Sequence, residues 1–251
     1  MPARNTNRPK VNVVIPARFA STRFEGKPLA KILGKPMIYY VYASCKKAKG
    51  VEDVIVATDD SRIKECVEGF GGRVVMTSNM HQTGTDRIAE VAQGLDADII
   101  VNAQGDEPLM DPQMIREAAT PLISDPGLSV TTLMSRLTSA EDFVDTTIVK
   151  LVKDTRNNVM FMTRSPVPYP KTRINYSVYK QIGLYAFRRE YLIRFTKMKQ
   201  TPLELIEGIE LLRVIESGHR LAAVETKHRT YSVDTLSDLI EVEKLIKRKA
   251  G

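Results

Sequence analysis

The sequence predicts an α/β protein with a mostly parallel central sheet, because apolar, β-branched runs alternate with segments of helical periodicity. The runs at 11–17, 54–58, 73–77 and 99–102 are nearly all apolar, as is typical of parallel strands covered on both faces. The chain has 251 residues, of which 43% are hydrophobic, and this is enough for one large α/β domain. We therefore expect a layered fold with its ligand site beyond the carboxyl ends of the strands.

Helical patterns fill the residues between these strands. Pro36 stands where a first helical turn tolerates proline, and Gly94 stands where a helix ends. Asp111, directly before Pro112, is the expected N-cap of a further helix. The predicted helices of this half cover 36–48, 62–70 and 86–93.

From about residue 128 the pattern becomes mixed. Strands are expected at 129–134, 148–152, 159–163, 179–187 and 220–225, and helices at 203–217 and from Leu236 onward. The segment Ser-Pro-Val-Pro-Tyr-Pro at 165–170 predicts a stiff loop, because its prolines cannot pair in a central strand. Met160, Phe161 and Met162 are expected in the core. We expect a flexible tail at 1–10 and a single domain at 11–251, of which about 128–218 form a smaller mixed lobe.

Composition excludes several classes of protein. No run approaches the ~18–20 apolar residues of a membrane span, and the N-terminal segment lacks the apolar core of a secretory signal. Cys45 and Cys66 can neither form a disulfide framework nor complete a four-ligand zinc site. These features predict a cytoplasmic, reduced protein that makes no membrane contact.

The net charge of +7 indicates a polyanionic partner, either a nucleic acid or a small phosphorylated ligand. The dense basic runs are terminal, at 4–10 and 244–249, and the interior cations are scattered. Aromatic residues make up only 6%, and no basic stripe is interleaved with them. The distribution favours a small phosphorylated ligand and no nucleic acid. A basic nucleotide-binding or nucleic-acid-binding protein is the non-enzymatic alternative.

Cations and hydroxyls gather in the loop after the first strand. Arg18, Ser21, Thr22, Arg23 and Lys27 fall within ten residues, where an α/β fold binds its ligand. Arginine forks and a lysine point charge suit phosphate oxygens, so the loop predicts a phosphate site rather than a merely solvated surface loop. It is neither a Walker A motif nor a GxGxxG dinucleotide loop.

Carboxylates follow two other strands. Asp106, in a Gly-Asp pair after the strand at 99–102, either binds a divalent ion or occupies a plain turn. Mg²⁺ takes one or two protein carboxylates together with substrate phosphates and waters. Asp234 either caps the last helix, a role that Thr235 could also fill, or supplies the second carboxylate. Both alternatives stay open at this point.

The segment 82–87 precedes a helix and predicts either a cap or a hydroxyl-rich turn that reads a base. His81, His219 and His228 lack metal-ligand spacing and are interpreted as surface or structural residues. Neither a GxSxG elbow nor a Ser/His/Asp order indicates a hydrolase.

Taken together, these segments resemble the 3-deoxy-manno-octulosonate cytidylyltransferase (CMP-Kdo synthetase) family. The resemblance covers almost the whole chain after residue 10, in the family's order and spacing. The segments that carry it are IPARFASTRFEGKPL at 15–29, GKPMI at 34–38, VATDD at 56–60, MTSNMHQTGTDR at 76–87, VNAQGDEPL at 101–109, TRSPVPYP at 163–170, YKQIGLYAF at 179–187 and VDT at 233–235.

The resemblance implies a Rossmann-like nucleotidyltransferase fold and transfer of CMP from CTP to the anomeric hydroxyl of 3-deoxy-D-manno-octulosonate (Kdo), giving CMP-Kdo and pyrophosphate. It also implies Mg²⁺ as cofactor, a role in lipopolysaccharide synthesis and a homodimer formed through the second lobe. The implied catalytic residues are Arg18, Lys27, Asp106 and Asp234, and the last two would hold the metal. The implied CTP-binding residues are Ala17, Arg18, Ser21, Arg23, Lys27, Met76, Thr83, Gly84, Thr85, Arg87 and Gln104. The implied acid-sugar residues are Arg164, Gln181, Tyr185, Glu210 and Leu211.

The chain departs from the family pattern at Gln181, where the family usually has His, and at Leu211, where it usually has Gln. A leucine side chain neither donates nor accepts a hydrogen bond, so one contact to a hydroxyl group of the acid sugar is expected to be missing. The departures are either tolerated drift or the mark of a modified ulosonic acid or another small acid as acceptor. A sugar-1-phosphate nucleotidyltransferase is a third alternative, although it would have a glycine-richer first loop.

Overall fold

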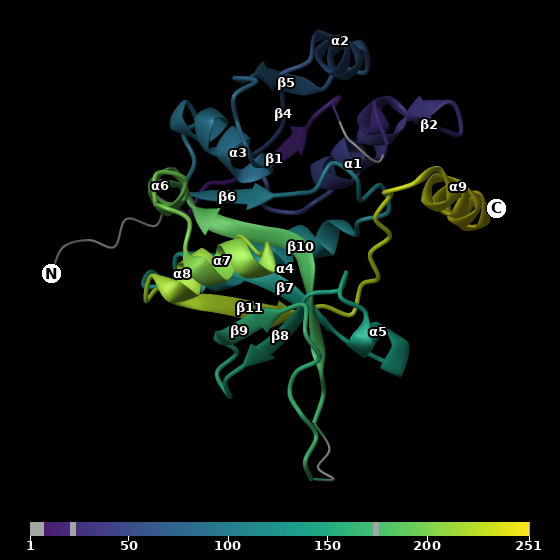
Figure 1. Cartoon of the computed structure of the whole chain (residues 1–251). Coiled ribbons are helices and arrows are strands. Elements are labelled where there is room, and N and C mark those ends of the chain that lie inside the picture. Colours follow the sequence, from purple (N-terminus) through teal and green to yellow (C-terminus); the bar gives the residue numbers. More distant parts are fainter. Residues whose placement is uncertain (1–7, 21–23, 173–175, 251) are drawn as a thin grey trace, which may run out of the picture.

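The computed structural model describes residues 8–20, 24–172 and 176–250, and within them one mostly parallel sheet runs through the molecule (Figure 1). The strand order is β11-β7-β10-β6-β1-β4-β5, and β8 joins β10 to β9. Pairing is parallel for β4-β1, β1-β6, β4-β5 and β11-β7, and β10 is antiparallel to its neighbours. The strands are β1 (Val11–Ala17), β4 (Asp53–Thr58), β5 (Arg73–Met76), β6 (Ile99–Asn102), β7 (Val130–Arg136), β8 (Lys150–Lys153), β9 (Val159–Thr163), β10 (Tyr179–Arg188) and β11 (Leu221–Glu225).

Helices cover both faces of this sheet, which confirms the predicted α/β class. A short hairpin, β2 (Lys31–Ile32) and β3 (Lys35–Pro36), precedes the first helix, so Pro36 lies before that helix rather than in its first turn. The helices are α1 (Met37–Lys46), α2 (Ser61–Gly69), α3 (Gly84–Gln93), α4 (Pro112–Ser124), α5 (Ala140–Val144), α6 (Arg189–Phe195), α7 (Pro202–Glu207), α8 (Leu212–Glu216) and α9 (Leu236–Ala250), with a 3₁₀ turn at Lys27–Leu29.

The alternation of side chains along β1 explains how the sheet is buried. Val13 and Ile15 belong to one core cluster, whereas Val14 belongs to the cluster on the opposite face. Because successive side chains of a strand point to opposite faces, a continuous apolar run fills both layers. The predicted strands are confirmed within two residues at each end.

Two expectations about the second half were wrong. The helix expected at 203–217 is two helices, α7 and α8, because Gly208 has φ 62° and ends α7 in the left-handed region. Met160 is 60% exposed, although Met162, two residues further on, is fully buried, because the β8–β9 register shifts between Val152 and Lys153 and leaves Met160 without a partner on β8. The helix break matters for the site, because the linker it creates lines a cavity.

The chain ends are anchored differently. Of the tail expected at 1–10, residues 1–7 lie outside the described residues, and Lys10 is bonded to Asp96 and Asp98 of the main body. At the other end, α9 packs through Leu239 and Val242 against the β2–β3 region. Across the described residues, every helix is too short or too polar to traverse a lipid bilayer.

Candidate functional site

The carboxyl ends of β1, β4, β5 and β6 lie at one edge of the sheet, and the residues assigned to CTP follow them. Arg18 follows β1, Met76 ends β5, and Gln104 comes two residues after β6. Strand pairing thus brings together segments that are far apart in sequence, as the parallel pattern predicted. Ser21 and Arg23 of the same loop lie outside the described residues.

Asp106 and Asp234 lie on either side of the Lys27 ammonium group. Lys27 Nζ is 2.7 Å from Asp106 Oδ2 and 3.2 Å from Asp234 Oδ1, and its side chain is 15% exposed. The backbone N–H of Val233 donates to the Asp106 carbonyl at 2.9 Å, which anchors the C-terminal segment beside the β6 loop. The three predicted catalytic residues from distant parts of the chain therefore share one cluster.

Gly105 allows Asp106 to lie so close to β1. A Cβ atom at position 105 would come within 2.9 Å of the Pro16 carbonyl oxygen, a separation that real side chains do not adopt. The glycine of the Gly-Asp pair is thus required by a close approach of two backbone segments.

The Asp106–Asp234 pair fits a divalent cation. A single ammonium group already contacts both carboxylates, so a positive charge is accommodated between them. Within the described residues no group of three or more acidic, His or Cys side chains could hold a metal. Carboxylates alone would then leave coordination positions for substrate oxygens and water, which is the mode that Mg²⁺ prefers.

Of the two candidates for the cap of the last helix, Asp234 and Thr235, the structure confirms Thr235. Thr235 Oγ1 accepts from the N–H of Asp238, and the Asp238 carboxylate accepts from the N–H of Thr235, so Thr235 caps α9. The Asp234 side chain faces Lys27 instead.

The turn before α3 is a capping box. Thr83 accepts from the N–H of Asp86, and Asp86 accepts from the N–H of Thr83. The predicted cap is confirmed, and it leaves the Thr85 hydroxyl to donate to Glu210 Oε2 at 2.7 Å. This turn therefore touches a residue assigned to the acid sugar.

Arg87, also assigned to CTP, is fully buried beneath this turn. Its guanidinium bonds Thr77 and, at 2.8 Å, Asp59 after β4. Arg87 and Asp59 line a cavity of about 400 Å³ together with Arg18, whose Nη2 donates to the Gln82 carbonyl at 2.8 Å. Its lining mixes cations with carboxylates, and Asp59 pairs with Arg87.

A larger cavity, of about 600 Å³, lies between the loop after β6 and the α7–α8 linker. Every residue assigned to the acid sugar lines it. The lining includes Gln104, Asp106, Arg164, Gln181, Tyr185, Glu210 and Leu211. We call this the acceptor cavity. Because Gln104 and Asp106 also belong to the sheet edge, the two groups of predicted residues meet at one site.

Arg164 connects the walls of the acceptor cavity. Its Nε donates to the Glu207 carbonyl at 2.9 Å, and its Nη1 donates to the Thr146 and Thr147 carbonyls. The guanidinium thus joins the C-terminal end of α7 to the turn before β8. Its fixed fork suits a carboxylate ligand.

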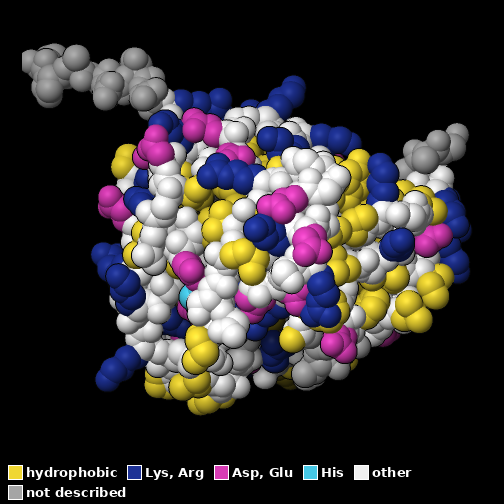
Figure 2. Space-filling model, turned by 90° about the horizontal axis from the view of Figure 1, so that it is seen from above, with side chains coloured by type: hydrophobic (Ala, Val, Ile, Leu, Met, Phe, Trp, Pro, Cys, Tyr) yellow, Lys and Arg dark blue, Asp and Glu magenta, His cyan; other side chains and the backbone are white. Residues whose placement is uncertain are grey.

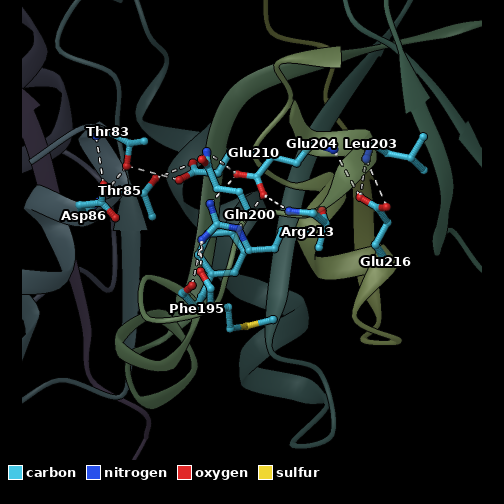
Figure 3. A network of polar contacts seen from close by, with 12 residues as sticks. Thr83, Thr85, Asp86, Phe195, Gln200, Leu203, Glu204, Glu210, Arg213 and Glu216 are labelled. Atoms are coloured by element: carbon cyan, nitrogen blue, oxygen red, sulfur yellow. Dashed lines mark hydrogen bonds and ion pairs between the residues drawn. The ribbon is translucent and has the colours of Figure 1, made fainter. Parts of the chain in front are cut away.

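Glu210 lies at the centre of the network shown in Figure 3. It bonds Thr85 on one side, and on the other side Arg213, one turn further, forms a bidentate ion pair with Glu204. Burial raises the pKa of Glu210 to about 7, and burial also raises the pKa of Tyr185 above its ordinary value. Glu210 therefore titrates near neutral pH, whereas the Tyr185 hydroxyl keeps its proton there.

Sequence reasoning missed several side chains of the acceptor cavity. Glu107, Lys180, Thr147 and Thr230 line it as well. Burial and the adjacent Asp106 carboxylate raise the pKa of Glu107 to about 7. Its position directly after Asp106 could have indicated a role, whereas Thr147 and Thr230 carry no recognisable signal.

The charge distribution agrees with a small ligand. On the face shown in Figure 2, Lys and Arg side chains are interspersed with Asp and Glu side chains and form no continuous basic stripe. A stripe of that kind would be expected for a nucleic-acid track.

Comparisons with known proteins agree with this geometry. The cytidylyltransferase family model matches residues 12–224. The 3-deoxy-manno-octulosonate cytidylyltransferase of Geobacter metallireducens is 49% identical over 250 residues, which cover 95% of this chain and 98% of that protein. A solved CMP:2-keto-3-deoxy-manno-octonic acid synthetase complexed with CTP has a TM-score of 0.92 and 38% identity, covering 96% of this chain and 99% of that chain.

A more distant structure shares the fold alone. The 4-diphosphocytidyl-2C-methyl-D-erythritol synthase of Anaerococcus prevotii has a TM-score of 0.64 at 13% identity, covering 96% of this chain and all of that chain. From the family model, the identity and the structural match, the chain belongs to the 3-deoxy-manno-octulosonate cytidylyltransferase family.

Proposed function

We propose that the protein transfers CMP from CTP to the anomeric hydroxyl of Kdo, releasing pyrophosphate. One observation carries the proposal. The acceptor cavity, lined by every residue assigned to the acid sugar, includes Asp106, which shares the Lys27 ammonium with Asp234. An acceptor in this cavity would thus lie beside the groups assigned to the triphosphate.

The first loop and the sheet edge would bind CTP. Arg18 and Lys27 would neutralise the triphosphate together with Ser21 and Arg23, and this charge neutralisation is the main demand of phosphoryl-type transfer. The turn from Thr83 to Arg87 and the backbone near Ala17 and Met76 would read the cytosine, and Gln104 would lie near the ribose.

Asp106 and Asp234 would hold Mg²⁺, for which their arrangement is suitable. When bound, the metal supplies charge neutralisation at the α-phosphate and lowers the pKa of a coordinated hydroxyl. The chain itself aligns the acceptor. The Arg164 fork would pair with its carboxylate, and Tyr185 and Glu210 would bond its hydroxyls.

The two residues that depart from the family pattern, Gln181 and Leu211, both line the acceptor cavity. Leu211 is 1% exposed and packs in the core cluster while lining the acceptor cavity, so it offers no polar contact there. Gln181 lies on the opposite wall, on β10. A modified ulosonic acid or another small acid is therefore the second candidate acceptor.

We also propose a homodimer formed through the second lobe. Exposed apolar side chains gather in this part of the chain, which is unusual for a surface that stays in water. Leu205 and Ile206 of α7 are 61% and 80% exposed, and Met160 and Tyr169 are 60% and 86% exposed. Light scattering should give a dimer for the wild type and a monomer for Ile206→Asp, whereas a monomeric wild type would contradict the proposal.

The proposed compartment is the cytoplasm. Cys45 and Cys66 are both free thiols, and a reducing compartment keeps them so. A fractionation experiment that found the protein outside the cytoplasm would contradict this.

Pyrophosphate release tests the function. The enzyme is given CTP and Mg²⁺ with Kdo, with no acceptor, with a hexose 1-phosphate, or with a panel of related acids. Rapid release with Kdo supports the proposal and makes Gln181 and Leu211 tolerated departures. Release with another acid but not with Kdo supports the same reaction with a different acceptor. Gln181 and Leu211 would then be the residues that select this acceptor. If no acid gives pyrophosphate release and the protein binds nucleic acid in a salt-sensitive way, the non-enzymatic alternative is favoured.

A further inference from the structure

Lys150, on β8, is a fully buried lysine outside the residues assigned to catalysis. Its ammonium group donates to the carbonyls of Asp145 at 2.6 Å, Ile148 at 2.9 Å and Arg164 at 2.7 Å. A protonated lysine has three N–H donors, so these bonds use all of them.

Keeping a charge at this position is costly. Transfer of an ammonium group from water to a protein interior is unfavourable, and burial lowers the pKa of Lys150. Its bonding partners are neutral carbonyls rather than carboxylates, and Asp145 and Glu207 act on it only through space. An apolar side chain of the same length would fill the space without that cost, so the charge itself requires a reason.

The bonds of Lys150 join two segments of the acceptor cavity. Asp145 and Ile148 flank the turn before β8, and Thr147, Ile148 and Val149 of that region line the cavity. Arg164 follows β9, which runs beside β8 (Figure 1). Lys150 therefore connects the turn before β8 to the backbone of Arg164.

Arg164 closes the ring from the other side. Its guanidinium donates to the carbonyls of Thr146 and Thr147 in the same turn, while its Nε donates to the Glu207 carbonyl. The Arg164 backbone is thus fixed by Lys150 and its side chain by the turn that Lys150 also holds. Loss of the ammonium would release both the turn and the main chain that carries the guanidinium.

We propose that Lys150 is a positioning residue for the acidic acceptor: it fixes Arg164 and the turn 145–149 in the acceptor cavity, and its buried charge adds to the attraction for a carboxylate. The inference rests on the proposed function, since it assigns the acceptor carboxylate to Arg164. Lys150 itself touches no reacting atom. Its effect should therefore fall on the binding of the acceptor and leave the binding of CTP unchanged.

The test compares Lys150→Met with Lys153→Met on the same strand. Lys153 is half-buried and places its ammonium 5.3 Å from the Tyr179 ring centroid, so the control removes a lysine without touching the acceptor cavity. KM and kcat are measured for Kdo and for CTP. The Nε–Hε resonance of Arg164, identified by its loss in Arg164→Lys, is followed in protein labelled with nitrogen-15 arginine.

We expect Lys150→Met to raise KM for Kdo by roughly 10-fold, because the substitution removes the charged hydrogen bonds that hold Arg164 and the turn in place. KM for CTP and kcat should stay within about twofold, and the Arg164 resonance should shift. Lys153→Met should change none of these. If Lys150→Met does not fold, Lys150→Gln, which keeps a polar end, should give the same pattern with a smaller rise.

Three outcomes would overturn the proposal. Lys150→Met could match Lys153→Met in every measurement, it could raise both KM values equally while lowering the melting temperature, or it could leave the Arg164 resonance unmoved. A wild type that is inactive with Kdo would refute the proposed function instead. The Arg164 resonance would then decide the positioning role separately, a shift supporting it and an unchanged position refuting it.

Discussion

The hydroxyl of Thr85 donates to Glu210 Oε2 at 2.7 Å, which joins the turn before α3 to the linker between α7 and α8. The turn belongs to the residues assigned to CTP, and the linker lines the acceptor cavity. This hydrogen bond, between side chains 125 positions apart, thus connects the two substrate sites of the proposed enzyme, and the Thr83 hydroxyl makes a longer one to Glu210 Oε1 at 3.5 Å.

Replacement of Thr85 by valine should weaken the binding of Kdo more than the binding of CTP. Valine keeps the shape of threonine and removes the donor, so the buried Glu210 carboxyl loses a partner. We expect KM for Kdo to rise about 10-fold and KM for CTP to rise less than about threefold, measured by pyrophosphate release. Thr120→Val, which removes a hydroxyl on α4, is the control. Equal increases in both KM values would contradict a role specific to the acceptor.

Replacement of Asp106 or Asp234 by alanine should abolish turnover while the fold survives. Each carboxylate is proposed to hold Mg²⁺, and losing either should lower kcat at least about 100-fold. The substitutions should leave the circular dichroism spectrum unchanged, since both side chains lie near the surface, 29% and 34% exposed. Asp96→Ala, whose carboxylate is 90% exposed, should retain normal activity. Normal turnover in either site variant would refute the metal assignment.

Glu210 should make the protein less stable as the pH rises. Its pKa of about 7 in the folded state lies above its ordinary value of 4.5, so between these values the folded state keeps a proton that the unfolded state has lost. The free energy of unfolding therefore falls over this range, and Glu107 contributes in the same direction.

Glu210→Gln removes this contribution and keeps an acceptor for Thr85. The variant should exceed the wild type in stability at pH 8 by on the order of 1–3 kcal/mol, with little difference at pH 5. Urea unfolding at both pH values measures this. A constant difference at the two pH values would contradict the raised pKa.

Breaking the buried Glu204–Arg213 ion pair should destabilise the protein strongly, although the intact pair adds little over apolar side chains in the same positions. The two side chains are 4% and 6% exposed, so Arg213→Met leaves a buried carboxylate without its partner. We expect a loss of about 3–5 kcal/mol in urea unfolding, most of it regained in Glu204→Leu/Arg213→Met. Arg220→Met, which breaks the exposed Arg220–Asp125 pair, should cost less than about 1 kcal/mol. A double variant as unstable as the single one would contradict this account.

The positions of many residues assigned to CTP could be predicted, because they directly follow strands that the sequence itself indicates. Arg18 follows a buried strand, and Asp106 follows its parallel neighbour, so parallel pairing alone places both at one edge of the sheet. The role of Asp234 was undecided in the sequence, because a carboxylate before a helix is equally suited to capping. The Val233–Asp106 backbone bond, between segments distant in the chain, holds the segment of Asp234 beside Asp106, and the Asp234 carboxylate contacts Lys27.

The acceptor side was harder to predict, because its contacts are long-range. The break at Gly208 was missed, since leucine and isoleucine continue the helical pattern on both sides of it. Lys150 resembles any strand lysine in the sequence, and nothing local shows that three carbonyls converge on its ammonium group.

The α/β class, the loops that follow the parallel strands and the charged residues in those loops could be predicted from the sequence. Periodicity and residue chemistry are local properties, so they can be recognised without the fold. Only packing determines which charges are buried, which carboxyl groups titrate near neutral pH, and which side chains meet across the acceptor cavity. These depend on the distance and solvent exposure that packing imposes on residues far apart in the chain.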